Sequence, residues 1–499
     1  MENYLAKAEE AVHRLLLTRK DRWYPVFHIA PKAGWLNDPN GLIYFKDRYQ
    51  VYFQHNPFSS EWGTMHWGHV SSTDMVTWRR EPIAFAPSIE EDEDGVFSGC
   101  AVTSDDGESL YVYYTGHRWR NGVNEDEGNL QVQMMATSED GVTFHDKKLI
   151  IDSPEGFVHF RDPKVWKMGD TWYMVLGASS TESRGQVWLY TSKDMRDWVF
   201  ERVLFEDPDE NVFMLECPDF IPFGDKWALQ YGPMGAKPAG YSSRNMVCSG
   251  YVVGDWKPGE DFKPLTEYRM SDWGHNYYAP QTFEAPDGRR IVLGWMGAVD
   301  LPPASQKDDG WCGQLTVPRV LTLSDDLTLI SQPVEELKKL RGEEVDFGAF
   351  EVGANDTFTL SEDAGPVEIE AVFNMAETTS ERIGFLVHRT PAGEHTYVGY
   401  DDLAGTVFID RRLAGNGDKG YRAVDVRDQV SAGEDLKLRI FVDNGSVEVF
   451  INDGREVASS LIFPADGTRA LQLASESGST KVKSLKMYEM NTIWETPDQ

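Results

Sequence analysis

Three acidic residues, Asp38, Asp162 and Glu216, could act together on one substrate. Each stands where an alternating apolar and polar segment begins, so each is expected just before the first strand of a sheet. Cleavage of a glycosidic bond with retention needs one ionised carboxylate as nucleophile and one protonated carboxyl group, held about 5 Å apart. The trio therefore indicates glycoside chemistry, provided that the fold brings the three side chains together.

The neighbours of these residues favour different roles. Glu216 lies in an apolar stretch, and removal from water raises the pKa of a carboxyl group, as an acid catalyst requires. Asp162 directly follows Arg161, whose cation would keep it ionised and suited to holding sugar hydroxyls. Each residue also has an ordinary structural interpretation. Asp38 lies in the turn-forming sequence 37–41, and the other two could belong to surface loops.

A repeated unit supplies the elements that would position the trio. Each copy has an alternating strand, a turn containing Asp or Gly, and a second strand rich in aromatic and branched residues. The turn aspartates recur at intervals of 55 to 64 residues: Asp47, Asp106, Asp170, Asp225 and Asp287. Five sheet units without long intervening helices predict a five-bladed β-propeller. The first strand of each blade lines the central axis, so the three carboxyl groups should converge at one end of the funnel.

The flanking segments complete an all-β prediction: a five-bladed β-propeller followed by a C-terminal β-sandwich, with a short N-terminal helix. We expect residues 1–24 to form the N-terminal helical segment and residues 25–334 to form the propeller. A Ser-x-Asp-x-x-x-aromatic marker at 72–78, 138–144 and 192–198 predicts a turn into an outermost strand. We predict a helical linker over residues 335–345 and the sandwich over residues 346–499. We expect no catalytic cluster in the sandwich.

The amino-acid composition limits the classes of molecule that we expect this protein to bind. The formal charge of −33 repels phosphate backbones and anionic lipid surfaces, so we expect neither a nucleic acid nor a membrane partner. Sixteen Trp and twenty Tyr suit sugar rings, although most should pack in sheet cores. The four cysteines are widely spaced, which predicts reduced thiols and no metal site, and no cofactor is expected. The charged N-terminus has no secretory apolar segment, so we expect a cytoplasmic protein. We expect a monomer or a homodimer.

Four motifs, in order along the chain, identify a family. They are Trp35-Leu36-Asn37-Asp38-Pro39-Asn40-Gly41, Phe97-Ser98-Gly99, Arg161-Asp162-Pro163 and Glu216-Cys217-Pro218-Asp219. The sequence resembles glycoside hydrolase family 32, the β-fructofuranosidases, which include invertases, sucrose-6-phosphate hydrolases and fructan exohydrolases. The resemblance spans nearly the whole chain, because that family joins a five-bladed propeller to a sandwich. It implies that Asp38 is the nucleophile, Glu216 the general acid/base and Asp162 the transition-state stabiliser.

The same resemblance implies a substrate pocket. The residues that match its fructose-binding positions are Asn37, Gln54, Trp62, Phe97, Ser98, Arg161 and Trp295, and Asp272 and Tyr278 match the segment that shapes the leaving-group side. Two positions depart from the family pattern. Asn276 stands where many bacterial members carry Asp, and Cys100 stands where Ser is commoner. These departures concern the preference for the leaving group.

The expected activity is retaining hydrolysis of the terminal β-fructofuranoside of sucrose and short fructooligosaccharides. Sucrose 6-phosphate as the substrate and transfer of fructose to another sugar remain open on the same scaffold. An inverting propeller glycosidase acting on arabinans would not need the Asp38 motif. A non-catalytic sugar-binding propeller would have no need of all three carboxyl groups, so the intact trio argues against it.

Overall fold

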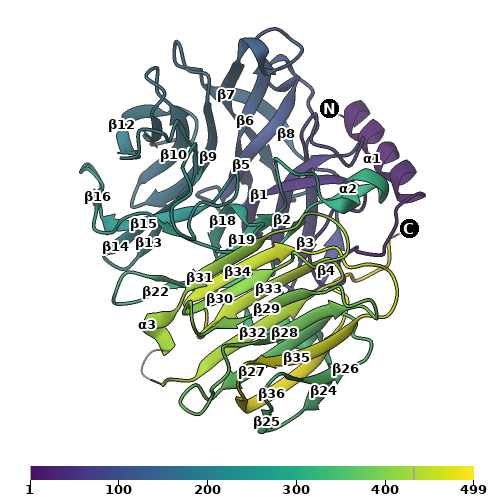
Figure 1. Ribbon diagram of the computed structural model, residues 1–499. Helices are drawn as coiled ribbons and strands as arrows, with labels where there is room; N and C mark the ends of the chain where they lie inside the picture. Colours follow the sequence, from purple (N-terminus) through teal and green to yellow (C-terminus); the bar gives the residue numbers. More distant parts are fainter. Residues whose placement is uncertain (1, 431–432, 499) are drawn as a thin grey trace.

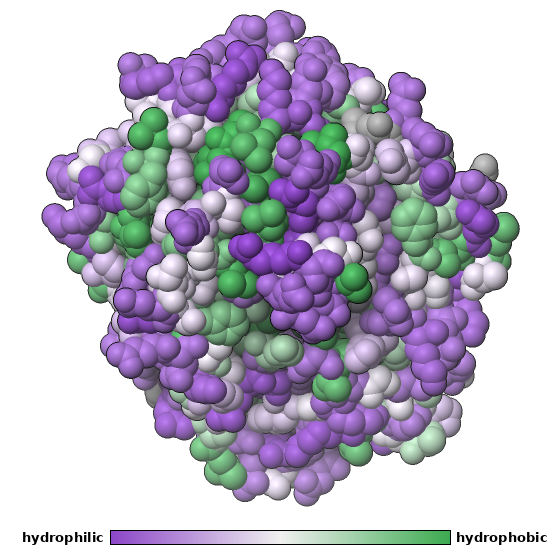
Figure 2. Space-filling model, turned by 90° about the horizontal axis from the view of Figure 1, so that it is seen from above, coloured by the Kyte–Doolittle hydropathy of each residue, from purple (hydrophilic) through white to green (hydrophobic). Residues whose placement is uncertain are grey.

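A computed structural model describes residues 2–430 and 433–498 as a ring of five β-sheets joined to a pair of stacked sheets (Figure 1). The predicted five-bladed propeller, C-terminal sandwich and N-terminal helix are confirmed; that helix is α1 (Glu2–Leu16). Among the described residues, no helix is long and apolar enough to cross a membrane. The propeller end of the molecule is mostly hydrophilic, with separate apolar patches (Figure 2).

The five blades follow one another along the chain. Blade 1 contains β1 (Gly34–Phe45), β2 (Arg48–Asn56), β3 (His66–Ser72) and β4 (Trp78–Arg80). Blade 2 contains β5 (Gly95–Thr103), β6 (Leu110–Trp119), β7 (Asn129–Ser138) and β8 (His145–Ile151). Blade 3 contains β9 (Phe160–Met168), β10 (Thr171–Ser179), β11 (Gly185–Ser192) and β12 (Val199–Glu206).

The last two blades carry additional short strands. Blade 4 contains β13 (Met214–Phe223), β14 (Lys226–Met234) and β15 (Gly250–Asp255), with β16 (Lys263–Pro264) and β17 (Arg269–Met270) both on β15. Blade 5 contains β18 (Tyr278–Glu284), β19 (Arg290–Met296), β22 (Arg319–Leu323) and β23 (Leu329–Pro333), with β21 (Gln314–Leu315) on β19. After α2 (Ala304–Asp308), β20 (Trp311–Cys312) pairs in parallel with β1 and so links the end of the ring to its beginning.

The turns predicted from the repeat occupy the positions expected of them. Each turn aspartate lies between the first two strands of its blade. In blade 1 both turn residues, Lys46 and Asp47, have positive φ, as a tight hairpin requires. The second marker is also confirmed: Asp74 Oδ1 accepts from the backbone N–H groups of Val76 and Thr77, at 3.1 and 2.8 Å, immediately before β4.

Two stacked sheets form the sandwich. One contains β24 (Arg341–Asp346), β36 (Thr480–Met490), β27 (Val367–Phe373), β32 (Leu436–Val442), β33 (Ser446–Ile451) and β34 (Glu456–Leu461), with β25 (Phe350–Val352) on β36. The other contains β26 (Asp356–Ser361), β35 (Ala470–Glu476), β28 (Arg382–Arg389), β29 (Thr396–Asp401), β30 (Thr406–Asp410) and β31 (Tyr421–Asp425). A short helix, α3 (Arg427–Val430), follows β31.

The linker prediction is wrong in its second half. Residues 335–340 form a 3-10 helix, whereas 341–346 are strand β24, which pairs with β36 of the sandwich. Arg341 explains the preference for a strand, because its guanidinium donates at 2.6–2.8 Å to Glu368 and Glu370 of β27, which lies two strands away in the same sheet. Contacts made in three dimensions override the local helix signal of this segment.

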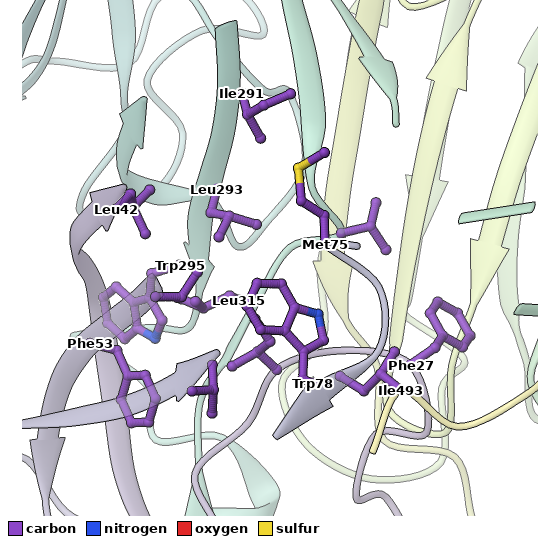
Figure 3. Packing of buried hydrophobic residues seen from close by; sticks show 14 of the residues in the cluster. Phe27, Leu42, Phe53, Met75, Trp78, Ile291, Leu293, Trp295, Leu315 and Ile493 are labelled. Carbon is purple, nitrogen blue, oxygen red and sulfur yellow. The ribbon is translucent and has the colours of Figure 1, made fainter. Parts of the chain in front are cut away.

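One apolar core runs from the propeller into the sandwich. Figure 3 shows Phe27 and Ile493, from the two ends of the chain, beside Trp78 of blade 1. Phe441 and Phe450 of the sandwich belong to the same cluster, and each is at most 2% exposed. Because this core is continuous, we expect neither domain to keep its stability without the other.

Buried charges also cross the boundary between the domains. His28 is paired through Nδ1 with Asp443 Oδ2 at 2.7 Å and through Nε2 with Glu448 Oε2 at 2.5 Å. Glu448 also accepts from Arg319 at 2.7 Å. Although burial by itself lowers the pKa of His28, the two carboxylates outweigh it and raise that pKa to about 9. The imidazolium therefore joins the propeller to the sandwich.

We expect His28→Ala to lower the free energy of unfolding by about 3–5 kcal/mol, because it leaves the buried Asp443 without its cation and Glu448 with Arg319 alone. In the native protein the pKa of His28 is raised above its unfolded value, so its contribution is fully present below about pH 6.5 and is lost as the pH rises through about 9. Urea unfolding at pH 7 and pH 10 tests both statements. The exposed His145 provides the control, since its replacement should change stability little. An unfolding midpoint for His28→Ala equal to that of the native protein at pH 7 would contradict the assignment.

Candidate active site

A cavity of about 800 Å³ opens where the innermost strands of the five blades begin. It contains every predicted catalytic or substrate-binding residue except Asp272. Those lining it are Asn37, Asp38, Gln54, Trp62, Phe97, Ser98, Arg161, Asp162, Glu216, Tyr278 and Trp295. The convergence predicted from the repeat is therefore present in three dimensions.

A bulge in each innermost strand aims these side chains into the cavity. The sequence placed the three carboxyl groups just before the strands, whereas they lie inside β1, β9 and β13. In every blade, the register of pairing between the first and second strands shifts near the start of the first strand. Asp162 and Cys217 adopt positive φ values of 70° and 48°, a conformation that costs roughly 1–3 kcal/mol and is typical of functional sites.

Asp38 is held by donors on three different segments. Ser98 Oγ donates to its Oδ2 at 2.6 Å, and Asn37 Nδ2 donates to its Oδ1 at 3.2 Å. Trp35 Nε1 donates to the amide oxygen of Asn37 at 2.7 Å, which turns the amide nitrogen toward Asp38. The thiol of Cys217 lies 3.5 Å from Oδ2. Removal from bulk water still raises the pKa of Asp38 above its usual value.

Glu216 receives the strongest donors of the site. Arg161 Nη2 donates to its Oε1 at 2.7 Å, and the Tyr278 hydroxyl donates to its Oε2. Burial alone would raise the pKa of Glu216, but the Arg161 cation and these hydrogen bonds outweigh it and lower the pKa. The raised pKa predicted from the apolar neighbours of Glu216 is therefore wrong for the free site. The neighbours in sequence are apolar, but the neighbours in space are a guanidinium and a phenol.

Asp162 carries the raised pKa instead. Its Oδ2 accepts from the backbone N–H of Cys217 at 2.9 Å, and its own N–H donates to Thr115 Oγ1 at 3.1 Å. Burial raises the pKa of Asp162 to about 7, because the Arg161 cation offsets only part of the effect of burial and of the nearby carboxylates. The expectation that Arg161 would keep Asp162 ionised is wrong, since the guanidinium makes its charged hydrogen bond with Glu216.

We expect the alkaline limb of the kcat/KM profile to belong to the three carboxyl groups as a unit, with an apparent pKa near 7. Their pKa values are coupled by proximity, and the last proton of the cluster leaves as the pH rises through that value. A reaction that needs this proton must slow above it. Initial rates between pH 4 and 9 measure the limb. A rate that stays constant up to pH 9 would show that no proton of the cluster is required.

Aromatic rings form one wall of the cavity. Trp62 is 46% exposed, and its ring meets Phe97 and Trp119 edge-on at centroid distances of 6.1 and 6.4 Å. Trp295 is buried beside Trp35 at 5.8 Å. Rings of this kind offer apolar faces to the C–H surfaces of a sugar, while the carboxyl groups face its hydroxyls.

Several lining residues escaped the sequence analysis. They are His117, Trp119, Gln131, His159 and Met234, which lie at or beside the strand ends that face the cavity. Thr115, His117 and Trp119 alternate along β6, and their partners Gln133, Gln131 and Asn129 alternate along β7. These polar residues in otherwise buried strands were a usable signal. Strand alternation alone does not say which side chains meet the axis and which meet the next blade.

Asp272 lies outside the cavity, and its assignment to the leaving-group side is wrong. It is 3% exposed and accepts from the Ser459 hydroxyl at 2.6 Å and from Arg319 at 3.2 Å. Ser459 belongs to β34 of the sandwich, so Asp272 joins the two domains. Asn276 is also at this boundary, where its Oδ1 accepts from the Leu461 N–H at 2.8 Å.

Comparison with known proteins agrees with this architecture. The family model "Glycosyl hydrolases family 32 N-terminal domain" matches residues 28–333, and "Glycosyl hydrolases family 32 C terminal" matches residues 336–489. A sucrose-6-phosphate hydrolase of Escherichia coli is 42% identical over 96% of this chain and 97% of its own length. A raffinose invertase of the same organism is 41% identical with the same coverage.

Solved structures give the same result. A β-fructofuranosidase of Bombyx mori superimposes with a TM-score of 0.86 at 31% identity, covering 99% of this chain and all of the other. A sucrose-6-phosphate hydrolase of Lactobacillus gasseri superimposes with a TM-score of 0.85 at 27% identity, covering 97% of each chain. The chain is a glycoside hydrolase and belongs to glycoside hydrolase family 32.

Proposed function

We propose that this protein is a retaining β-fructofuranosidase that releases fructose from sucrose and short fructooligosaccharides. The observation that carries the proposal is the arrangement around Cys217, whose thiol lies 3.5 Å from both Asp38 and Asp162 and whose preceding residue is Glu216. All three of these acidic residues line the same cavity. Relatives with the names sucrose-6-phosphate hydrolase, raffinose invertase and β-fructofuranosidase support the fructoside as substrate.

In the first step, Asp38 attacks the anomeric carbon of the fructosyl unit, and the bond from that carbon to the leaving oxygen breaks. Glu216 gives its proton to this oxygen, so the leaving sugar departs neutral and an ester with Asp38 remains. Substrate hydroxyls that donate to Asp162 lower its pKa, which leaves Glu216 as the group that retains the proton.

In the second step, Glu216 takes a proton from water, and the resulting hydroxide oxygen bonds to the anomeric carbon while the Asp38 ester breaks. Fructose leaves with its original configuration, and Glu216 is protonated again. Arg161 and Tyr278 serve this cycle because they stabilise Glu216 whenever it is ionised. The chemistry needs only these side chains and water.

Products released under identical conditions test the proposal. Sucrose, sucrose 6-phosphate, raffinose, kestose and inulin are supplied separately, and fructose is measured together with its first-formed anomer. The proposal predicts fructose of retained configuration from sucrose and kestose. Inverted product, or binding without cleavage of any of these sugars, would refute it. Fructosyl oligosaccharides as the main products at high sucrose would assign the protein as a transferase.

Two further features belong to the proposal. We place the protein in the cytoplasm as a monomer or homodimer, with a neutral sugar as its partner. All four cysteines are buried free thiols, which is compatible with a reducing compartment. Cell fractionation and light scattering test the location and the oligomeric state.

A further inference from the structure

A histidine that no motif of the family singled out stands next to the acid/base residue. His159 precedes β9 directly, is half-buried and lines the cavity. Its ring centroid lies 5.9 Å from that of Phe213, which fixes one side of the imidazole. Among residues 2–430 and 433–498, no hydrogen-bond partner is found for its Nε2. The ring therefore has one nitrogen available to a molecule in the cavity.

Arg161 determines the tautomer of this histidine. Arg161 Nη1 donates to His159 Nδ1 at 2.8 Å. A guanidinium has donors and no acceptor, so Nδ1 must present its lone pair and the proton of the neutral ring must be on Nε2. Burial, together with the Arg161 cation, lowers the pKa of His159 to about 4. The ring is then neutral at mildly acidic and neutral pH, with a fixed N–H donor at Nε2.

The strand geometry places the Nε2–H of His159 nearer the opening of the cavity than the side chain of Arg161, which contacts Glu216. His159 and Arg161 are two positions apart, so their side chains leave the strand on the same side, roughly 6.6 Å apart along the chain. Arg161 contacts Glu216. β9 begins at the end where the cavity opens, so His159 lies nearer the opening than Arg161 does. The fructosyl unit must lie deeper, against Asp38 and Asp162, and the leaving sugar nearer the opening.

We propose that His159 is a specificity-determining residue, whose Nε2–H donates a hydrogen bond to a hydroxyl oxygen of the leaving sugar. This inference rests on the proposed function, because it needs a fructoside whose leaving group is a sugar. A neutral donor suits the hydroxyl of an uncharged sugar. The residue would favour sugars over simple alcohols as leaving groups.

Two substrates separate this role from an indirect one. Sucrose and methyl β-D-fructofuranoside share the fructosyl unit, and in both the leaving oxygen needs a proton from Glu216. Only sucrose presents hydroxyls in its leaving group. In His159→Asn, the amide oxygen can replace Nδ1 as the acceptor for Arg161, but no donor reaches the position of Nε2. We expect kcat/KM on sucrose to fall about tenfold and that on the methyl fructoside to change less than twofold.

His159→Gln is the matched variant, because its amide nitrogen reaches the position of Nε2. We expect it to keep the sucrose-to-methyl-fructoside ratio of the native enzyme, even if both rates fall. The pH at the alkaline limb should stay unchanged in His159→Asn, since Glu216 keeps its partners. Circular dichroism and the melting temperature of both variants establish that they are folded.

An equal fall on both substrates, or a displaced alkaline limb, would show that His159 acts through Arg161, and the proposal would be wrong. Unchanged rates on both substrates would also overturn it. A native enzyme that cleaves neither fructoside would instead overturn the proposed function itself. The two failures are therefore distinguishable.

Discussion

Asp38→Asn is expected to lower kcat on sucrose by at least about a thousandfold, because an amide cannot form the ester with the fructosyl unit. The fold should survive, since the amide has the same shape and its oxygen can still accept from Ser98. The thermal midpoint should not fall and should even rise at pH 7. The raised pKa of Asp38 means that its ionised form is less stable in the folded protein than in water. Initial rates and calorimetry measure the two effects.

Asp272→Asn is the matched control for this result, because Asp272 is a buried aspartate outside the cavity. We expect it to lower stability, since Arg319 and Ser459 lose a charged partner, while the rate per folded molecule changes little. Turnover by Asp38→Asn within tenfold of the native rate, with deamidation excluded by mass spectrometry, would falsify the nucleophile assignment.

Glu216→Ala is expected to remove most turnover on sucrose, by about a hundredfold to ten-thousandfold, because the leaving oxygen then departs without a proton. A leaving group that needs no proton, such as p-nitrophenol, should retain a much larger share of its rate in the first step. Azide should then accelerate the second step by attacking the Asp38 ester, giving fructosyl azide. Product analysis with and without azide measures this rescue.

The pH profile of Glu216→Ala tests whether the proton required by the reaction reaches the leaving oxygen through Glu216. The alkaline limb should flatten in Glu216→Ala, since no proton needs to reach the leaving oxygen through that residue. Glu216→Gln serves as the comparison, because it keeps the shape and an acceptor oxygen for Arg161, and its amide N–H can donate to the Tyr278 hydroxyl oxygen. If the limb is unchanged in both variants, another carboxyl group is the acid, and Asp162 with its pKa of about 7 is the first to replace. Asp219 is a weaker alternative, because its Oδ2 is already bonded to Thr282 at 2.8 Å.

Local signals predicted much of this architecture. Turn residues such as Asp106-Gly107 mark hairpins because few residues tolerate the backbone angles that a tight turn needs. Their regular recurrence then predicted five blades, and blade geometry predicted that Asp38, Asp162 and Glu216 would meet. Strand β34 has no strong local signal, because serines such as Ser459 and Ser460 are common in loops, yet these two bond Asp272 and His275 across the domain boundary.

The sequence by itself determined the blades, the sandwich and the trio of carboxyl groups, since all three follow from chain periodicity and from motifs within a few residues of one another. Only the tertiary structure decided which carboxyl group holds the proton. A pKa depends on charges and donors within a few ångströms, and those around Glu216 come from β9 and β18, far away in sequence. Contacts between residues far apart in sequence also explain why Asp272 lies outside the cavity. Its neighbours in sequence resemble a substrate-binding segment, but its partners in space, Arg319 and Ser459, tie the propeller to the sandwich.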